Sequence, residues 1–210
     1  MNRADRRDLY RLLGGLLQRS PSEALLSALA STATLRRLAG GVAREGAVRD
    51  ALRWMDADLA RGTPSFVQIR QDYSALFARP GRPLAPPWES AYRAADAATD
   101  VRRAYAARGI VFEGMGERAP DHVGYELEFV SVLLAQGTHS RTARRARNEF
   151  LSEHVLRWLP AWAADVCEHS TGVFMHGVGD VVAGLCAAER HRLTSPRRWA
   201  REPFRIISAA

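Results

Sequence analysis

Hydrophobic positions recur every three or four residues along most of the chain, which is the spacing of amphipathic α-helices. From Arg3 to Gln18 they form a broad leucine stripe. The same spacing predicts further helices from Ser20 to Gly41, Ala47 to Arg61, Thr63 to Phe77, Thr99 to Gly109, Asp121 to Leu134, Arg141 to Trp162 and Gly179 to Leu193. No stretch alternates as a strand would. The pattern predicts an all-α fold, either one domain over residues 1–210 or two closely packed helical lobes joined by a hinge near 113–121.

Capping residues and prolines mark the ends of these helices. Ser20 is followed by Pro21 and Glu23, which predicts a capping box at the start of the second helix, with Leu25, Leu26 and Leu29 turned inward. Pro160 interrupts an apolar stripe that includes Trp158 and Trp162. Because its ring cannot donate to the Leu156 carbonyl, we expect a kink there.

A proline-rich connection breaks the helical pattern between residues 79 and 88. Four prolines and a glycine in ten residues favour an extended, stiff segment. This segment delivers Trp88, Glu89, Ser90 and Tyr92 to the start of the next element. A tryptophan placed in this way either fills the core or offers its ring to a ligand.

The densest acidic stretch of the chain follows, between residues 113 and 128. The stretch contains a single arginine, and its carboxylates are Glu113, Glu117, Asp121, Glu126 and Glu128. Pro120 biases the preceding residue away from helix, and Asp121 is a candidate cap for the helix behind it. The stretch is then an ordinary helix start. Alternatively, His122 beside this loop contacts a ligand, because loops held on rigid helices often carry function.

The overall charge is strongly positive, with thirty basic residues, all of them arginine, and a formal net charge of +7. An arginine-only composition with many Ala and Gly residues indicates a coding bias, so the charge says little about partners. Four arginines fall between Arg141 and Arg147. This segment is either a solvated helix face or the surface of a helical nucleic-acid-binding regulator.

Motifs for catalysis, cofactors and metals are missing from the sequence. A P-loop needs a lysine, and no G-x-S-x-G occurs. No glutamate precedes a histidine by three residues, and Asp121, His122 and Glu126 lack a second ligand set. We therefore expect a protein that is not an enzyme and holds no cofactor or metal.

The cysteines and the apolar runs bear on where the protein works. Cys167 and Cys186 are 19 residues apart and predict reduced thiols rather than a disulfide framework. The longest charge-free runs are twelve residues, against the roughly 18 to 20 of a membrane span. With no export signal at the N-terminus, we expect a cytoplasmic protein without membrane insertion.

Three stretches together resemble one family. They are Tyr73 to Phe77 followed by a proline loop to Trp88, Glu89, Ser90, Ala91 and Tyr92; Glu117 with the run from Pro120 to Phe129; and Phe150, Leu151, His154, Trp158, Pro160 and Trp162. In order and spacing over residues 66–165 the chain is similar to the TorD/DmsD-type redox-enzyme maturation proteins, with NarJ-type chaperones as more distant relatives. Many members have a second proline where this chain has Ala119.

This resemblance implies an all-helical cytoplasmic chaperone, monomeric or homodimeric. Its partners would be an apo molybdoenzyme catalytic subunit of the DMSO-reductase class, held until cofactor insertion, and the twin-arginine signal peptide of that subunit. The peptide-binding residues implied by the family are Trp88, Pro120, Asp121 and His122, with Glu89, Ser90, Tyr92 and Glu126 nearby. Carboxylates beside exposed aromatics would suit a peptide that joins two arginines to an apolar segment.

Overall fold

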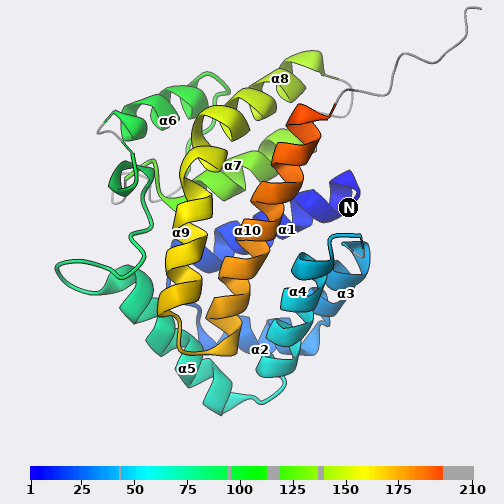
Figure 1. Ribbon diagram of the computed structural model, residues 1–210, viewed down its shortest axis with the longest axis vertical. Helices are drawn as coiled ribbons and strands as arrows, with labels where there is room; N and C mark the ends of the chain where they lie inside the picture. Colours follow the sequence, from blue (N-terminus) through cyan, green and yellow to red (C-terminus); the bar gives the residue numbers. More distant parts are fainter. Residues whose placement is uncertain (43, 94–95, 113–118, 137–139, 196–210) are drawn as a thin grey trace, which may run out of the picture.

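The fold is helical throughout the computed structural model, which describes residues 1–42, 44–93, 96–112, 119–136 and 140–195 (Figure 1). The α-helices are α1 (Arg3–Gln18), α2 (Glu23–Ser31), α3 (Thr34–Gly41), α4 (Gly46–Leu59), α5 (Thr63–Tyr73), α6 (Ala97–Ala106), α7 (Val123–Gln136), α8 (Arg141–Phe150), α9 (Leu156–His169) and α10 (Val173–Thr194). Three short elements join them: the π turns η1 (Ser74–Ala78) and η3 (Leu151–Val155), and the 3₁₀ turn η2 (Glu89–Ala91). Within the described ranges no strand forms, so the all-α prediction is confirmed.

The helices pack as one domain around a shared core. Helices α9 and α10 lie side by side, α4 packs against α10, and α1 packs along α7 behind them (Figure 1). Trp158 and Trp162 of α9 are fully buried in this core. The hinge predicted near 113–121 lies largely outside the described residues, which resume at Ala119. None of the described helices has the length and apolar character that a membrane crossing requires.

Helices α1 and α7 approach each other through two glycines. A Cβ atom on Gly124 would lie 2.6 Å from the Gln18 Cγ atom and 3.0 Å from the Gly14 carbonyl oxygen. A Cβ atom on Gly14 would lie 3.0 Å from the Gly124 carbonyl oxygen. Side chains are excluded at both positions, so the backbones themselves make the contact. This contact seats the first turn of α7 on the last turns of α1.

Two predicted details of the second helix are wrong. Ser22, not Ser20, is the N-cap, because its hydroxyl accepts from the Leu25 amide at 3.2 Å. Leu25 is 38% exposed, whereas Leu26 and Leu29 are buried as expected. The segment also divides into α2 and α3, because Ala33 adopts a left-handed conformation with φ of 49°. Sequence periodicity alone does not register such a single-residue break.

Other helix boundaries agree with the pattern to different degrees. Helix α1 matches the prediction at both ends, and α4 ends before Gly62 as expected. Helix α10 begins at Val173, six residues before the predicted Gly179. The buried residues Phe174, Met175 and Val178 extend its apolar face into that first part.

The Leu156 carbonyl cannot accept a backbone hydrogen bond from Pro160, and it accepts one from a side chain of a neighbouring helix instead. Pro160 lies inside α9 and has no amide hydrogen to donate. Instead, Arg190 of α10 donates from Nη2 to the Leu156 carbonyl oxygen at 2.8 Å. An arginine from one helix of the pair therefore replaces a backbone hydrogen bond missing from the other.

Replacing Arg190 tests this substitution of one hydrogen bond for another. We expect Arg190→Met to lower the free energy of unfolding by about 1 kcal/mol, because the Leu156 carbonyl loses a donor. In a Pro160→Ala background the same replacement should cost less, because an amide at position 160 can then donate. Denaturant unfolding of the four proteins gives the coupling energy. Arg145→Met, which breaks an exposed pair with Glu149, is the control and should change stability by less than about 0.5 kcal/mol. Equal losses from Arg190→Met in both backgrounds would contradict this account.

Candidate functional site

The proline-rich connection and the start of α7 are held together by backbone hydrogen bonds. The Val123 amide donates to the Pro87 carbonyl at 2.9 Å, and the Glu89 amide donates to the Asp121 carbonyl at 3.0 Å. Between them, Trp88 and His122 form an isolated antiparallel bridge. We call residues 87–90 and 121–123 the junction. It brings together the two motifs in which the sequence places Trp88, Asp121 and His122.

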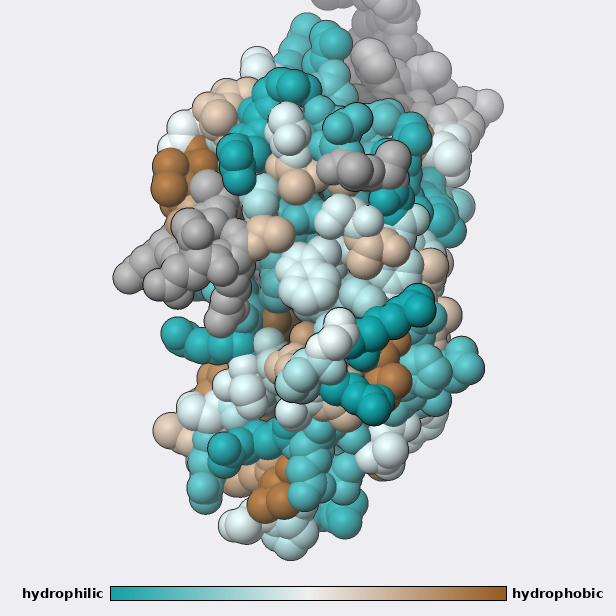
Figure 2. Space-filling view, turned by 90° about the vertical axis from the view of Figure 1, so that its left-hand side faces the viewer, coloured by the Kyte–Doolittle hydropathy of each residue, from teal (hydrophilic) through white to brown (hydrophobic). Residues whose placement is uncertain are grey.

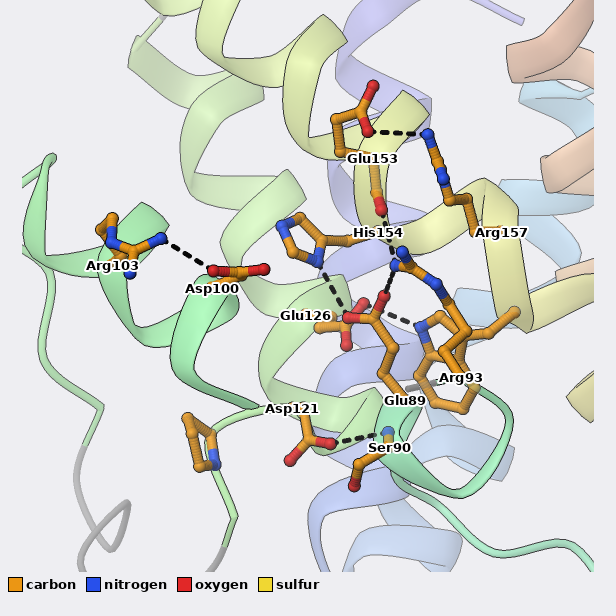
Figure 3. Close-up of polar contacts among 12 residues, drawn as sticks. Glu89, Ser90, Arg93, Asp100, Arg103, Asp121, Glu126, Glu153, His154 and Arg157 are labelled. Carbon is orange, nitrogen blue, oxygen red and sulfur yellow. Dashed lines mark hydrogen bonds and ion pairs between the residues drawn. The ribbon is translucent and has the colours of Figure 1, made fainter. Parts of the chain in front are cut away.

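The Asp121 carboxylate belongs to this junction and does not cap α7. Its Oδ2 atom accepts from the Ser90 amide at 2.8 Å, and its Oδ1 atom has no partner in the described part of the chain (Figure 3). The side chain is 0% exposed. The Gly124 amide in the first turn of α7 donates to the His122 Nδ1 atom at 3.1 Å instead. The predicted cap at Asp121 is therefore wrong, and the imidazole of His122 fills that role.

A second buried carboxylate, Glu89, links η2 to the helices above it. Its Oε2 atom lies 2.9 Å from the Nδ1 atom of His154 in η3, and its Oε1 atom accepts from Arg93 (Figure 3). Arg93 also donates to the Glu153 carbonyl at 2.7 Å. Glu89 is 0% exposed, so its charge is compensated inside the protein rather than by solvent.

The third carboxylate, Glu126, lies in α7 next to this pair. Its Oε2 atom accepts from the Trp158 indole at 3.1 Å, and its Oε1 atom has no hydrogen-bond partner among the described residues. Burial raises the pKa of Glu126 well above its usual range, and the negative charge of Glu89 raises it further. Glu126 therefore stays protonated in the folded protein to a higher pH than an exposed glutamate does.

The remaining predicted site residues are placed around the junction with different exposure. Ser90 is exposed, Trp88 and Tyr92 are half-buried, and Pro120 is buried with its carbonyl accepting from the Tyr105 hydroxyl at 3.1 Å. The Tyr92 hydroxyl donates to the Asp165 Oδ2 atom at 2.6 Å. Burial is the main cause that raises the pKa of Tyr92, and the hydrogen bond to Asp165 raises it further. Tyr92 is thus anchored to α9.

A cavity of about 520 Å³ opens beside the junction. It is lined by aromatic and apolar groups with a few polar ones: Gln18, Arg19, Ser20, Tyr73, Phe77, Ala78, Pro87, Trp88, Ala119 and His122. Described carboxylates are absent from this lining, because Glu89, Asp121 and Glu126 are all buried. The arrangement expected from the sequence, with carboxylates beside exposed aromatics, is therefore not formed by these three side chains. Of the other acidic residues in that stretch, Glu113 and Glu117 lie outside the described residues, and Glu128 bonds to Gln18.

The face of the molecule that carries the proline-rich connection and α6 shows no large apolar patch among its described residues. Apolar areas on that face are small and separated by polar residues (Figure 2). A cavity of about 600 Å³ lies elsewhere, beside Trp54 and Val173.

On α8, Arg141, Arg144 and Arg145 are exposed, and Arg145 pairs with Glu149 at 2.6 Å. This exposure agrees with both interpretations of the segment, a solvated helix face and a nucleic-acid-binding surface.

Three partners of the buried carboxylates are missing from the predicted site. His154 and Trp158 belong to the third motif of the family resemblance, but their apolar neighbours favour a purely structural stripe. Arg93 follows Glu89 by four residues, the spacing of a helical ion pair. That spacing could have identified Arg93 as a partner of Glu89, and the third motif could have identified His154 and Trp158.

Metal ligands do not assemble at the junction. Among the described residues, Asp121, His122 and Glu126 do not bring three ligand atoms within reach of one ion. Within the described ranges, the side chains that do come together as a ligand set are Cys167, His176 and Asp180, at the other end of α9.

The fold and the site define an all-helical protein in which charged residues hold two sequence motifs together beside an apolar cavity. Residues 43–164 match the nitrate reductase delta subunit family, and the chain belongs to that family. Among curated proteins, the chain is 26% identical over 172 residues to "Chaperone protein TorD" of Vibrio cholerae serotype O1 (strain ATCC 39315 / El Tor Inaba N16961), covering 75% of this chain and 78% of the relative. It is 27% identical over 174 residues to the protein of the same name from strain M66-2, with the same coverage. The family resemblance noted in the sequence is thereby confirmed.

Replacing Glu126 tests its ionisation through stability. Because the pKa of Glu126 is higher in the folded chain than in the unfolded chain, the folded state holds an extra proton between these two pKa values. The free energy of unfolding therefore falls as the pH rises above the ordinary carboxyl pKa of about 4.3, at up to about 1.4 kcal/mol per pH unit. Glu126→Gln cannot ionise and can still accept from Trp158, so it should reduce this decline and be at least as stable as the wild type at pH 8.

Urea unfolding at several pH values between 5 and 8 measures the effect. Glu149→Gln replaces an exposed carboxylate on α8 and should leave the decline unchanged. Parallel pH profiles for the wild type and Glu126→Gln would show that Glu126 is not neutral in the folded protein.

Proposed function

We propose that this protein is a cytoplasmic chaperone that binds the twin-arginine signal peptide of a redox enzyme before its export. Membership of the nitrate reductase delta subunit family and the similarity to proteins named as chaperones support this class. Those relatives are named as chaperones rather than enzymes, in agreement with the expectation of a non-catalytic protein. By the family resemblance, the client is an apo molybdopterin oxidoreductase of the DMSO-reductase class.

The cavity beside Trp88 and His122 is the observation that carries the proposal. Four stretches of the chain line it, and Tyr73, Phe77, Pro87, Trp88 and His122 among the lining residues belong to the motifs that the family resemblance implicates. Tyr73, Phe77 and Pro87 give it apolar walls suited to the hydrophobic part of a signal peptide. A half-buried tryptophan at the rim can gain contact area when such a segment enters.

The buried carboxylates act in this proposal from beneath the cavity. Glu89, Asp121 and Glu126 fix the junction, and with it the positions of Trp88 and His122 on the cavity side, while Pro120 is buried behind them. Ser90 and Tyr92 lie at the outer end of the same segment and extend the binding surface along η2. Trp88 and His122 make the direct contacts, and the carboxylates determine the shape of the surface.

Peptide binding by matched tryptophan variants tests the proposal. The probe is a synthetic peptide with two arginines followed by an apolar segment, and affinity is measured by calorimetry. We expect micromolar or tighter binding that Trp88→Ala weakens at least tenfold, because the ring forms part of the cavity wall. Trp54→Ala removes a 57% exposed tryptophan beside the other cavity and should leave the affinity unchanged. Loss of binding in Trp54→Ala but not in Trp88→Ala would place the peptide elsewhere and contradict the proposed site.

Two further experiments complete the test. One distinguishes residues that contact the peptide from residues that support the site, and the other distinguishes peptide binding from nucleic-acid binding. Asp121→Ala should weaken binding together with stability, whereas Asp121→Asn, which keeps an acceptor for the Ser90 amide, should retain most of both. Duplex DNA titrated over a salt series examines the alternative of a nucleic-acid-binding regulator acting through Arg141 to Arg147. Specific, steeply salt-dependent DNA binding without peptide binding would favour that alternative and overturn the proposal.

A further inference from the structure

Cys167, His176 and Asp180 form a compact group of three different metal-ligating side chains at the α9–α10 turn. Cys167 is in the last part of α9, and His176 and Asp180 are one helical turn apart in α10. One ligand atom from each side chain lies within 4.8 Å of the others. Figure 1 shows the two helices running side by side away from this turn. His176 is exposed and the other two side chains are half-buried, so the group is accessible to an ion from solvent.

The spacing of the ligand atoms is close to that of a tetrahedral zinc site. The Cys167 Sγ and Asp180 Oδ1 atoms are 3.7 Å apart, and the His176 Nε2 and Asp180 Oδ2 atoms are 3.8 Å apart. Zinc bond lengths of about 2.3 Å to sulfur and about 2.0 to 2.1 Å to nitrogen and oxygen place neighbouring tetrahedral ligands about 3.3 to 3.5 Å apart. With one ligand atom from each residue within 4.8 Å of the others, side-chain movements of about one ångström would bring all three to that spacing around one ion.

The orientation of His176 provides a second, independent indication. Its Nδ1 atom lies 3.1 Å from the Cys167 carbonyl oxygen, to which a protonated Nδ1 donates. In a neutral ring, this bond leaves the lone pair on Nε2, the atom that faces Asp180. Metal-binding histidines commonly use one nitrogen in this way to fix the ring while the other binds the ion.

The surrounding backbone keeps the three side chains in place. A Cβ atom on Gly179 would lie 2.5 Å from the Cys167 Sγ atom, so the glycine leaves the space that the sulfur occupies. Asp72 of α5, which is 4% exposed, accepts from the Gly172 amide at 2.7 Å and from the Thr171 hydroxyl at 2.6 Å. These bonds fix the turn between Cys167 and His176, so the ligand geometry does not depend on a flexible loop.

We propose that Cys167, His176 and Asp180 bind a divalent transition-metal ion of the zinc type through one thiolate sulfur, one imidazole nitrogen and one carboxylate oxygen. The thiol proton is released to solvent on binding, and a fourth position stays open for water. A mixed sulfur, nitrogen and oxygen set favours Zn²⁺ over Mg²⁺ or Ca²⁺, which prefer oxygen ligands alone. The proposal does not depend on the proposed peptide-binding function, since the junction lies at the other end of α9.

Titration of the chelator-treated full-length protein with Co²⁺ tests the site directly. Cobalt bound by a thiolate in a tetrahedral site gives ligand-to-metal charge-transfer absorption together with visible bands. We expect one equivalent per chain, displaced by Zn²⁺, and a rise in melting temperature with Zn²⁺. Cys167→Ser should abolish the charge-transfer absorption, and His176→Gln and Asp180→Asn should each weaken binding at least tenfold.

Matched variants at residues outside the group complete the experiment. Cys186→Ala removes the other thiol, and His169→Gln changes a histidine at the end of α9; both should bind as the wild type does. The alternative arrangement without metal is an imidazolium–carboxylate pair with the thiol donating to Asp180. Absence of the charge-transfer absorption with the wild type, its survival in Cys167→Ser, or its loss in Cys186→Ala would each overturn the proposal. Circular dichroism of every variant confirms that lost binding is not lost folding.

Discussion

The buried Glu89 carboxylate is the constraint around which the candidate site is organised. A charge removed from water requires partners with good geometry, since an unpaired one would cost several kcal/mol. Glu89 finds them in Arg93 and in His154 of η3, while its backbone amide binds the Asp121 carbonyl. Segments from three parts of the sequence must therefore meet before this charge is satisfied. Such a contact favours a single arrangement of the proline-rich connection over many loosely packed ones.

The fold could be predicted from the sequence because helical periodicity is a local signal, whereas the site depended on contacts across the chain. The leucine stripe of α1 and the stop before Gly62 were correctly identified from residues close together. The exposure expected of the carboxylates beside the aromatics is wrong for Asp121 and Glu126, because clustered acids look the same in sequence whether they face solvent or an indole such as that of Trp158. Ala33 shows a different limit: an alanine carries no sign that it will adopt a left-handed conformation and divide a helix.

The distribution of charge gives the candidate site an uncommon character. The surface is rich in arginine, while Glu89, Asp121 and Glu126 are enclosed beneath the cavity. A protonated Glu126 carries no charge, and Arg93 offsets the charge of Glu89. In the proposed function, the wall of the cavity at Trp88 and His122 supplies apolar contact and shape.

The two π turns have a consequence for how this chain tolerates insertions and deletions. A π turn carries one residue more than a regular helix, and each residue advances the helix by about 100°. In η1 the Leu76 carbonyl accepts a hydrogen bond from the Ala85 amide at 2.9 Å. The turn η3 contains His154, whose ring contacts Glu89. Removing one residue from either turn would produce a smoother helix. In η1 the deletion would rotate the start of the proline-rich connection about the helix axis, and in η3 it would rotate the side chains of α9 relative to Glu89. Helical regularity and site geometry thus oppose each other at these two places.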